Sequence, residues 1–350
     1  MDVKSLVDLY SDYLIAVSGL FTATGLSAMV NNEISHDEVT RMLSSGHIDS
    51  AFLWKSVKAS CYEISDEEGV LIIDDSVEEK RYTDKSELIC WHYDHSQGKT
   101  VKGVNFMTAL YHNHGMSLPI GVEFVKKTKP FVDKKGALVL KSERSKNEMY
   151  RDLLRHADRN MDFKYVLSDA WFTNAGNMNF IVKDIKHHFI MGMKENRLVA
   201  FSKELQQQGK YVSIKSLELE GRTMSVYLKG LDFPVLISKQ VFKNEDGSTG
   251  VLYLVTSDLN LTYEQITTIY HKRWKVEQYH QSIKSNTAFS KSPTKTPKTQ
   301  ISHFIVSILA FAKLELLQLR KGKNHHALKS QILLKATKAA YDEVIKLSTP

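Results

Sequence analysis

The sequence predicts an α/β protein in which a mixed sheet carries helices on its faces, with a helical unit before it and an all-β insertion within it. Three observations lead to this prediction. Apolar runs mark strands between residues 70 and 124, helical spacing then alternates with strand-like runs up to residue 195, and short runs with a hairpin signal follow. The chain has 350 residues, 42% of them hydrophobic, so a sizeable core is expected.

Residues 1–69 are predicted to form an N-terminal helical unit. Ser35 and Glu38 have the spacing of a capping box, which begins a helix that continues through Met42. The first helix carries its apolar side chains on one stripe: Leu6, Leu9, Tyr13 and Leu14. The polar run at residues 65–69 ends the unit.

Residues 70–195 are predicted to form the first part of the core. The run from Val70 to Ile73 is apolar throughout, as in a strand that is covered on both faces. Strands at 103–111 and 118–124, joined by a turn, complete a three-strand meander. Alternating elements follow: helices at 147–160 and 174–182, and strands at 165–168 and 189–193.

Residues 196–257 are predicted to form the all-β insertion, because short apolar runs follow one another and Asp246-Gly247 signals a hairpin turn. Helical spacing returns at Thr262, so the core continues over residues 258–320. Residues 321–350 are predicted to form a C-terminal helical tail.

The most apolar window, residues 301–319, is predicted to be a buried core helix. His303, Lys313 and Glu315 interrupt it, and one charge at the centre of a membrane helix costs about 2.5–3.5 kcal/mol. The first 21 residues also lack the pattern of a secretory signal. We therefore expect a soluble protein with no membrane partner.

The charge distribution favours a polyanionic partner for most of the chain. The net charge is +7, but residues 1–68 contain 4 Lys and Arg against 11 Asp and Glu, which leaves +14 for the remainder. A basic body of this kind suits nucleic acid. Cys61 and Cys90 are too few for a disulfide framework or a four-cysteine zinc site, so a reducing, cytoplasmic setting is expected.

The stretch from residue 270 to 284 carries the most chemical information. At about 100° per residue, four side chains fall on one helix face: Tyr270, Arg273, Glu277 and Lys284. Val276, Tyr279 and Ile283 fall on the opposite side, so the helix is predicted to bury these three and to present the other four outward. Such a face suits a divalent cation and phosphate oxygens, although a solvated face of mixed charge is the alternative.

This spacing resembles the signature of a group of bacterial insertion-sequence transposases of the DDE type, which have Tyr, Arg, Glu and Lys at these positions. The group has its first aspartate at the end of an apolar strand, as Asp74 is here. Its second aspartate stands in a setting similar to residues 166–172, which contain Asp169. The stretch that begins with Tyr93-Asp94-His95 is also similar, and the resemblance covers roughly residues 70–320.

The resemblance implies a ribonuclease-H-like core in which Asp74, Asp169 and Glu277 are catalytic and ligate metal. Such a triad can hold two divalent ions about 4 Å apart, and its oxygen ligands favour Mg²⁺ or Mn²⁺. Tyr270, Arg273 and Lys284 are implied to bind the DNA backbone. The implied reaction is cleavage at a transposon end followed by strand transfer into target DNA.

The implied partner is double-stranded DNA, both transposon ends and target, on which a homodimer or larger assembly forms. The implied location is the bacterial cytoplasm, at the nucleoid when the protein is active. Two alternatives remain open. One is a ribonuclease-H-like nuclease or resolvase that cuts without joining, and the other is a non-catalytic DNA-binding protein derived from a transposase.

Several residue assignments also remain open at this stage. Asp75 competes with Asp74, because neighbouring strand residues point to opposite faces. Asp169 has a helix cap as its alternative role. The pair His112 and His114 is better explained by a turn than by a metal site. A Ser/Thr/Pro-rich loop holds three further lysines that contact either DNA phosphates or only solvent: Lys291, Lys295 and Lys298.

Two features of the sequence depart from the family pattern. No tryptophan occurs between residues 196 and 257, where hairpin-forming relatives can hold a flipped base against an aromatic side chain; the substitutes available are Tyr211, Tyr227 and Tyr253. The N-terminal unit is acidic, whereas an element that grips transposon ends should be basic.

Overall fold

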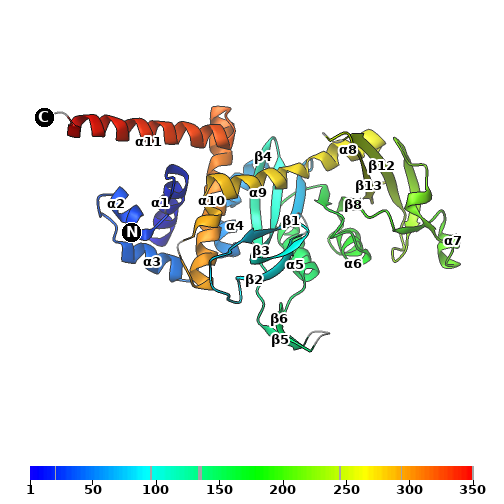
Figure 1. The fold of residues 1–350 in the computed structure, drawn as a ribbon. Helices are drawn as coiled ribbons and strands as arrows, with labels where there is room; N and C mark the ends of the chain where they lie inside the picture. Colours follow the sequence, from blue (N-terminus) through cyan, green and yellow to red (C-terminus); the bar gives the residue numbers. More distant parts are fainter. Residues whose placement is uncertain (20, 95–96, 133–135, 244–245, 293, 349–350) are drawn as a thin grey trace.

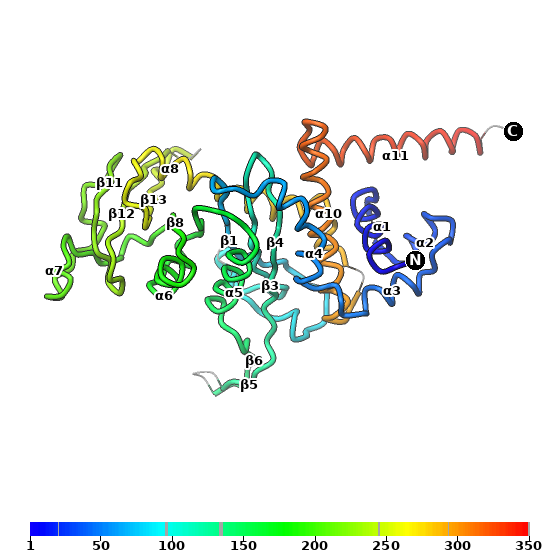
Figure 2. The backbone as a smooth tube through the Cα atoms, turned by 180° about the vertical axis from the view of Figure 1, so that it is seen from behind, coloured from blue at the N-terminus to red at the C-terminus, as the bar shows by residue number. Residues whose placement is uncertain are grey.

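A computed structural model describes residues 1–19, 21–94, 97–132, 136–243, 246–292 and 294–348. Its centre is a mixed sheet that extends from the middle of the molecule to one end (Figure 1). The first N-terminal helices lie at the opposite end, and the view from behind in Figure 2 shows the same arrangement. His95, part of the family-like stretch, lies outside the described residues.

The central strands have the order and directions of a ribonuclease-H-like sheet. β1 (Val70–Glu79), β3 (Lys99–Asn113) and β4 (Met116–Phe124) form an antiparallel meander. β7 (Tyr165–Ser168) lies parallel to β1, and β8 (His188–Met193) lies parallel to β7. The order β4-β3-β1-β7-β8 confirms the predicted fold class. The short strand β2 (Cys90–Asp94), which the sequence analysis did not predict, pairs with the beginning of β3.

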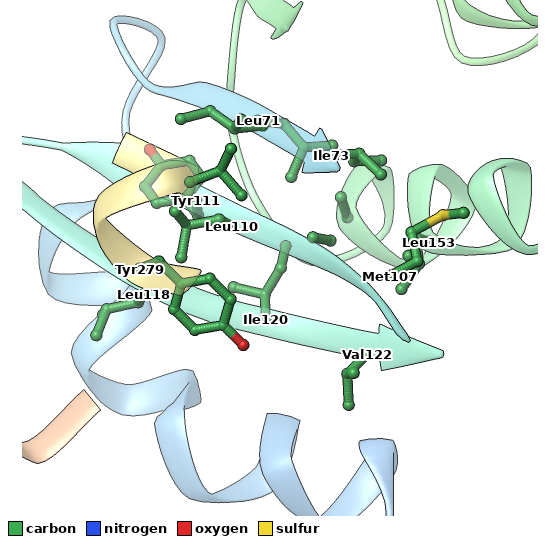
Figure 3. Close-up of a cluster of buried hydrophobic side chains, with 14 of the residues drawn as sticks. Leu71, Ile73, Met107, Leu110, Tyr111, Leu118, Ile120, Val122, Leu153 and Tyr279 are labelled. Atoms are coloured by element: carbon green, nitrogen blue, oxygen red, sulfur yellow. The ribbon is translucent and has the colours of Figure 1, made fainter. Parts of the chain in front are cut away.

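Helices cover both faces of this sheet. On one face, Leu153 of α5 (Lys146–Asp158) packs close to Gly121 of β4. On the other face, the hydroxyl of Tyr279 in α9 (Trp274–Asn286) is 3.3 Å from Thr108 Oγ1 of β3. Figure 3 shows the buried side chains of β1, β3 and β4 together with Leu153 and Tyr279. Coverage on both sides explains the unbroken apolar run at the start of β1.

The N-terminal segment is helical, as predicted. Its elements are α1 (Val3–Ala16), α2 (Ala23–Met29), α3 (His36–Ser44) and α4 (Ser50–Ile64). The capping box of Ser35 and Glu38 is present at the start of α3. α4 packs on β4, and one hydrophobic core joins the N-terminal helices to the sheet. The boundary at residue 69, like those at 195, 257 and 320, stays a prediction.

The predicted core helix over residues 301–319 is confirmed as part of α10 (Pro297–Lys321). This helix packs against α1, α3, α4 and β4, and Tyr10 Oη is 2.9 Å from His303 Nδ1. Among the described residues, α10 alone is long and apolar enough to cross a membrane, yet 78% of its most apolar window is buried inside the protein. Thr296 caps the helix and Pro297 occupies its first turn.

The insertion extends the central sheet, because β13 pairs antiparallel with β8. Its strands are β9 (Leu198–Ala200), β10 (Val212–Ser213), β11 (Thr223–Leu228), β12 (Val235–Lys243) and β13 (Thr249–Thr256). The prediction that the insertion is all-β is wrong, since it also contains α7 (Lys203–Gln207) and a 3₁₀ turn at Ile214–Ser216. Ser202 caps α7, and a helix of five residues is too short to show a helical period.

The predicted helix across residues 270–284 is two helices. α8 (Tyr263–His271) ends at His271 and α9 begins at Trp274, so Lys272 and Arg273 form the turn between them. The remaining elements are α6 (Ala175–Asn179), which continues as a π-helical turn at Phe180–Asp184, the hairpin strands β5 (Lys129–Val132) and β6 (Leu138–Lys141), a 3₁₀ turn at Phe289–Lys291, and the tail helix α11 (His325–Ser348).

Candidate active site

Strand register brings Asp74 and Asp169 to the same place. Ile72 of β1 is level with Leu167 of the parallel strand β7, so Asp74 and Asp169 each follow two residues further along. Side chains at matched positions of parallel strands point to the same face. Burial raises the pKa of Asp74 well above its usual value, and the negative charge of Asp169 raises it further. The pKa of Asp169 is raised as well, mainly by burial.

Asp75, the next residue of β1, also lines the cleft described below, but its carboxylate has other partners. Its Oδ2 accepts hydrogen bonds from Lys146 Nζ at 2.6 Å and from Asn105 Nδ2 at 3.0 Å. Asp74 pairs across the sheet with Thr108, whose side chain contacts α9. Of the two neighbouring acids, Asp74 is therefore the one on the side of Glu277.

Arg273 links the first acid to the third. Its Nη1 is 3.3 Å from Asp74 Oδ2 and 3.3 Å from Glu277 Oε1. The Arg273 side chain is only 14% exposed, whereas that of Glu277 is 45% exposed. The turn between α8 and α9 places the guanidinium between a buried carboxylate on the sheet and a more accessible one on the helix.

Tyr270 is buried, so the prediction that its phenol faces outward is wrong. Its hydroxyl donates to the carbonyl of Ser168 at 3.4 Å, and burial raises its pKa to about 12. The helical projection put Tyr270 on the face of Glu277. In the structure α8 lies against β8, and the Tyr270 side chain reaches the end of β7. The other part of the projection is confirmed, because Val276, Tyr279 and Ile283 are buried.

Lys284 ties α9 to β1. Its Nζ is 3.2 Å from Ser76 Oγ, 3.3 Å from the carbonyl oxygen of Val77 and 3.6 Å from Glu78 Oε2. Burial raises the pKa of Glu78, and the ammonium of Lys284 opposes that rise. This lysine is half-buried, so it positions the helix that carries Glu277 and still reaches the surface.

Four of the predicted site residues line a cleft of about 630 Å³: Asp74, Asp169, Glu277 and Lys284. Tyr270 and Arg273 are not among its lining residues. Further lining residues were not predicted as site residues: Tyr93, Asp94, Trp171, Lys194, His280 and Gln281. Lys146, also not predicted, holds Asp75 and lies 5.3 Å from the centre of the Trp171 ring. Tyr93, Asp94 and Trp171 had a signal in the sequence, because each lies in a stretch that resembles the family.

The three lysines of the Ser/Thr/Pro-rich segment do not line this cleft among the described residues. Lys291 and Lys295 are exposed, and Lys291 Nζ lies 5.7 Å from the centre of the Phe21 ring. Lys298 is exposed in the first turn of α10 and lies against Gly46. His112 bonds to Ser117, and His114 stands in the turn before β4, in keeping with the turn that the sequence favoured.

The donor set suits a hard divalent cation in its chemistry. The three acids offer only oxygen, and the raised pKa of Asp74 reports buried negative charge that a cation would stabilise. The side chains are not arranged around one point, since no group of three His, Cys, Asp or Glu within the described part of the chain is placed to hold a metal. The guanidinium of Arg273 stands between Asp74 and Glu277 instead.

A ribonuclease-H-like sheet with one carboxylate midway along β1, Asp74, and a second directly after the parallel strand β7, Asp169, defines the general class of this protein; the prediction that Asp74 ends its strand is wrong, because β1 continues to Glu79. Comparison with protein families then identifies it more closely. Residues 6–211 match the DDE superfamily endonucleases, and residues 136–311 match the transposase DDE domain. The chain belongs to the DDE superfamily.

Comparison with curated proteins finds no match. Among solved structures, the Drosophila P element transposase strand transfer complex is similar over 93% of this chain and 82% of that chain, with 10% identity and a TM-score of 0.29.

Gly192 provides a test of how tightly the site is built. A methyl group on this residue of β8 would lie 2.9 Å from Tyr270 Oη and 3.3 Å from the backbone nitrogen of Ala170. We expect Gly192→Ala to displace the loop that carries Asp169 and to lower the cleavage rate at least about 10-fold, because small misplacements of reacting groups are costly. Cleavage assays with thermal melts would check this. A cleavage rate equal to that of the parent protein would show that the loop accommodates the methyl group without displacing Asp169.

Proposed function

We propose that this protein is a DNA transposase that cleaves DNA at transposon ends and joins the freed 3′ end to target DNA. The observation that carries the proposal is the meeting of Asp74, Asp169 and Glu277 at one cleft, with Arg273 and Lys284 beside them. Family membership supports it independently. We also assign the chain to the bacterial group with the Tyr-Arg-Glu-Lys signature.

Asp74, Asp169 and Glu277 would hold two Mg²⁺ or Mn²⁺ ions. When bound, such ions supply Lewis-acid chemistry that activates an attacking oxygen and stabilises a leaving oxygen. Asp74 interacts electrostatically with Asp169 and is linked to Glu277 through Arg273, so we propose that it would serve both ions. The greater exposure of Glu277 lets its carboxylate turn toward the cleft.

The basic side chains of the site bind and orient the DNA backbone. Lys194 and Lys284 border the cleft, and Lys146 lies at its edge beside Asp75. Arg273 has a buried Nε without a hydrogen-bond partner among the described residues, and its guanidinium would contact a phosphate oxygen once the side chain turns from Asp74 and Glu277 into the cleft. Tyr270 acts through its contact with Ser168, which holds the residue before Asp169 in place.

We propose double-stranded DNA as the partner, both transposon ends and target, with a homodimer or larger assembly on DNA. The proposed location is the bacterial cytoplasm, at the nucleoid. Lys291, Lys295 and Lys298 are exposed away from the cleft, where they are available to contact a DNA segment beyond the cleaved phosphate.

A strand-transfer assay tests the proposal. The donor is a labelled duplex copied from the DNA that flanks the reading frame, and the target is a supercoiled plasmid. We expect joined product with Mg²⁺ or Mn²⁺ and none after chelation with EDTA. Cleavage without joined product would instead identify a nuclease or resolvase, and DNA binding without either reaction would identify a non-catalytic DNA-binding protein.

A further inference from the structure

The hairpin of β5 and β6 stands apart from the central sheet. We call its described strand residues, Lys129–Val132 and Leu138–Lys141, the β5–β6 arm. The two strands pair only with each other, and all eight residues are exposed. The arm projects from the body in both views (Figures 1 and 2). A two-stranded hairpin with no packed face is marginally stable in water, so this one is built to be covered by a partner.

The two faces of the arm differ in chemistry. Because side chains alternate along a strand, the pairs Lys129/Lys141 and Phe131/Val139 share one face. Lys141 Nζ lies 3.1 Å from the centre of the Phe131 ring. The other face is wholly apolar and consists of Pro130, Val132, Leu138 and Leu140. Leu138 is 73% exposed, so nothing within the described chain covers this face.

The root of the arm is fixed to the body. The backbone nitrogen of Lys127 donates to the carbonyl of Glu87 at 2.8 Å, and its ammonium donates to the carbonyl of Trp91. Thr128 donates from its nitrogen to Lys141 at 3.1 Å and from its hydroxyl to Glu143 at 2.8 Å. These bonds give the exposed strands a defined direction.

The arm begins at the edge of the sheet that carries the cleft. Phe124, the last residue of β4, is level with Phe106 of β3, which is level with Ser76 of β1. Ser76 lies two residues beyond Asp74 on the same strand and lines the cleft. The chain returns from the arm to α5, whose first residue, Lys146, pairs with Asp75. Both ends of the arm therefore adjoin the candidate active site.

We propose that the β5–β6 arm binds the DNA duplex that enters the cleft, which rests on the proposed DNA-cleaving function. Charge selects this partner: the described residues 125–132 and 136–142 contain four lysines and no acidic residue, so they carry +4 beside an apolar surface. A two-stranded ribbon fits the major groove, where apolar side chains contact thymine methyl groups and lysines reach phosphates. A protein partner would suit the apolar face alone and would make no use of the exposed charges of Lys129 and Lys141.

The test measures duplex binding by the full chain without divalent metal, so that it is separate from cleavage. The probe is a fluorescent DNA duplex of mixed sequence, and its affinity is measured by anisotropy over a range of salt concentrations. The charge variant Lys129→Gln/Lys141→Gln changes two exposed lysines. Its matched control, Lys335→Gln/Lys338→Gln, changes two exposed lysines on α11.

We expect the charge variant to reduce the slope of log affinity against log salt by about 1.8, because each lost phosphate contact contributes about 0.9. The control should keep the parent slope. The apolar variant Leu138→Ser/Leu140→Ser should weaken binding several-fold at an unchanged slope. Thermal melts should show all variants folded, since the changed side chains lie outside the core.

Other outcomes overturn the proposal in distinguishable ways. A parent slope in the charge variant, with the parent still binding and cutting DNA, would remove the arm from the interface and leave the proposed function intact. A smaller sedimentation mass of the apolar variant, at parent DNA affinity, would show that the arm docks on a second copy. A parent protein that binds no duplex would refute the proposed function together with the arm.

Discussion

Asp74→Asn, Asp169→Asn and Glu277→Gln should each lower the cleavage rate by at least about 10³-fold and leave DNA affinity nearly unchanged. Each change removes an anionic oxygen ligand, and cation stabilisation of several kcal/mol in the transition state corresponds to such a factor. Phosphate contacts come from lysine and arginine, so binding persists. The measurements are single-turnover cleavage with Mg²⁺ and duplex affinity without metal.

Asp75→Asn is the matched control for the first acid. Asp75 also lines the cleft, but its Oδ2 is bonded to Lys146 and Asn105, so its amide variant should keep most of the cleavage rate. Retained cleavage in Asp74→Asn together with loss in Asp75→Asn would show that the neighbouring residue is the ligand. Reduced thermal stability in the aspartate variants would call for a readout at lower temperature, where all of them are folded.

Arg273→Ala should lower cleavage by about 10²-fold, the order expected when one preorganised charged donor is lost from a reaction site. It should also lower stability, because breaking a buried ion pair costs up to about 3–5 kcal/mol when the remaining carboxylate stays charged. Arg273 is the cation that contacts both Asp74 and Glu277. The measurements are cleavage at saturating DNA and the free energy of unfolding in denaturant.

The double variant Arg273→Ala/Asp74→Asn separates the two effects. Removing the buried charge of Asp74 should restore much of the stability lost in Arg273→Ala, while cleavage stays absent. Lys275→Ala serves as the surface control, since the ammonium of Lys275 bonds Gln278 on the same helix and Lys275 does not line the cleft. If Arg273→Ala cuts and melts like Lys275→Ala, the ion pairs that Arg273 makes contribute nothing.

The sequence by itself determined the features that depend on neighbours along the chain. The apolar runs before Asp74 and Asp169 correctly predicted a strand before each acid, because strand character is visible over a few residues, although β1 continues past Asp74 to Glu79. The spacing of Ser35 and Glu38 predicted a helix start that the structure confirms. The interval from Tyr270 to Lys284 pointed to the transposase family before any contact was known, and the family comparison agrees at the level of the DDE superfamily.

Only the tertiary structure decided which groups face one another. The choice of face for Asp74 against Asp75 follows from where α9 and Lys146 pack on the sheet. The burial of Tyr270 depends on the break between the two helices at residues 272–273 and on the missing side chain of Gly192, whose place the Tyr270 hydroxyl takes. A helical projection shows neither of these features. Contacts between distant segments depend on strand register and helix packing, and neither can be predicted from the residue spacing within one element. The projecting arm belongs to this second group, because its exposure is a property of what the rest of the chain leaves uncovered.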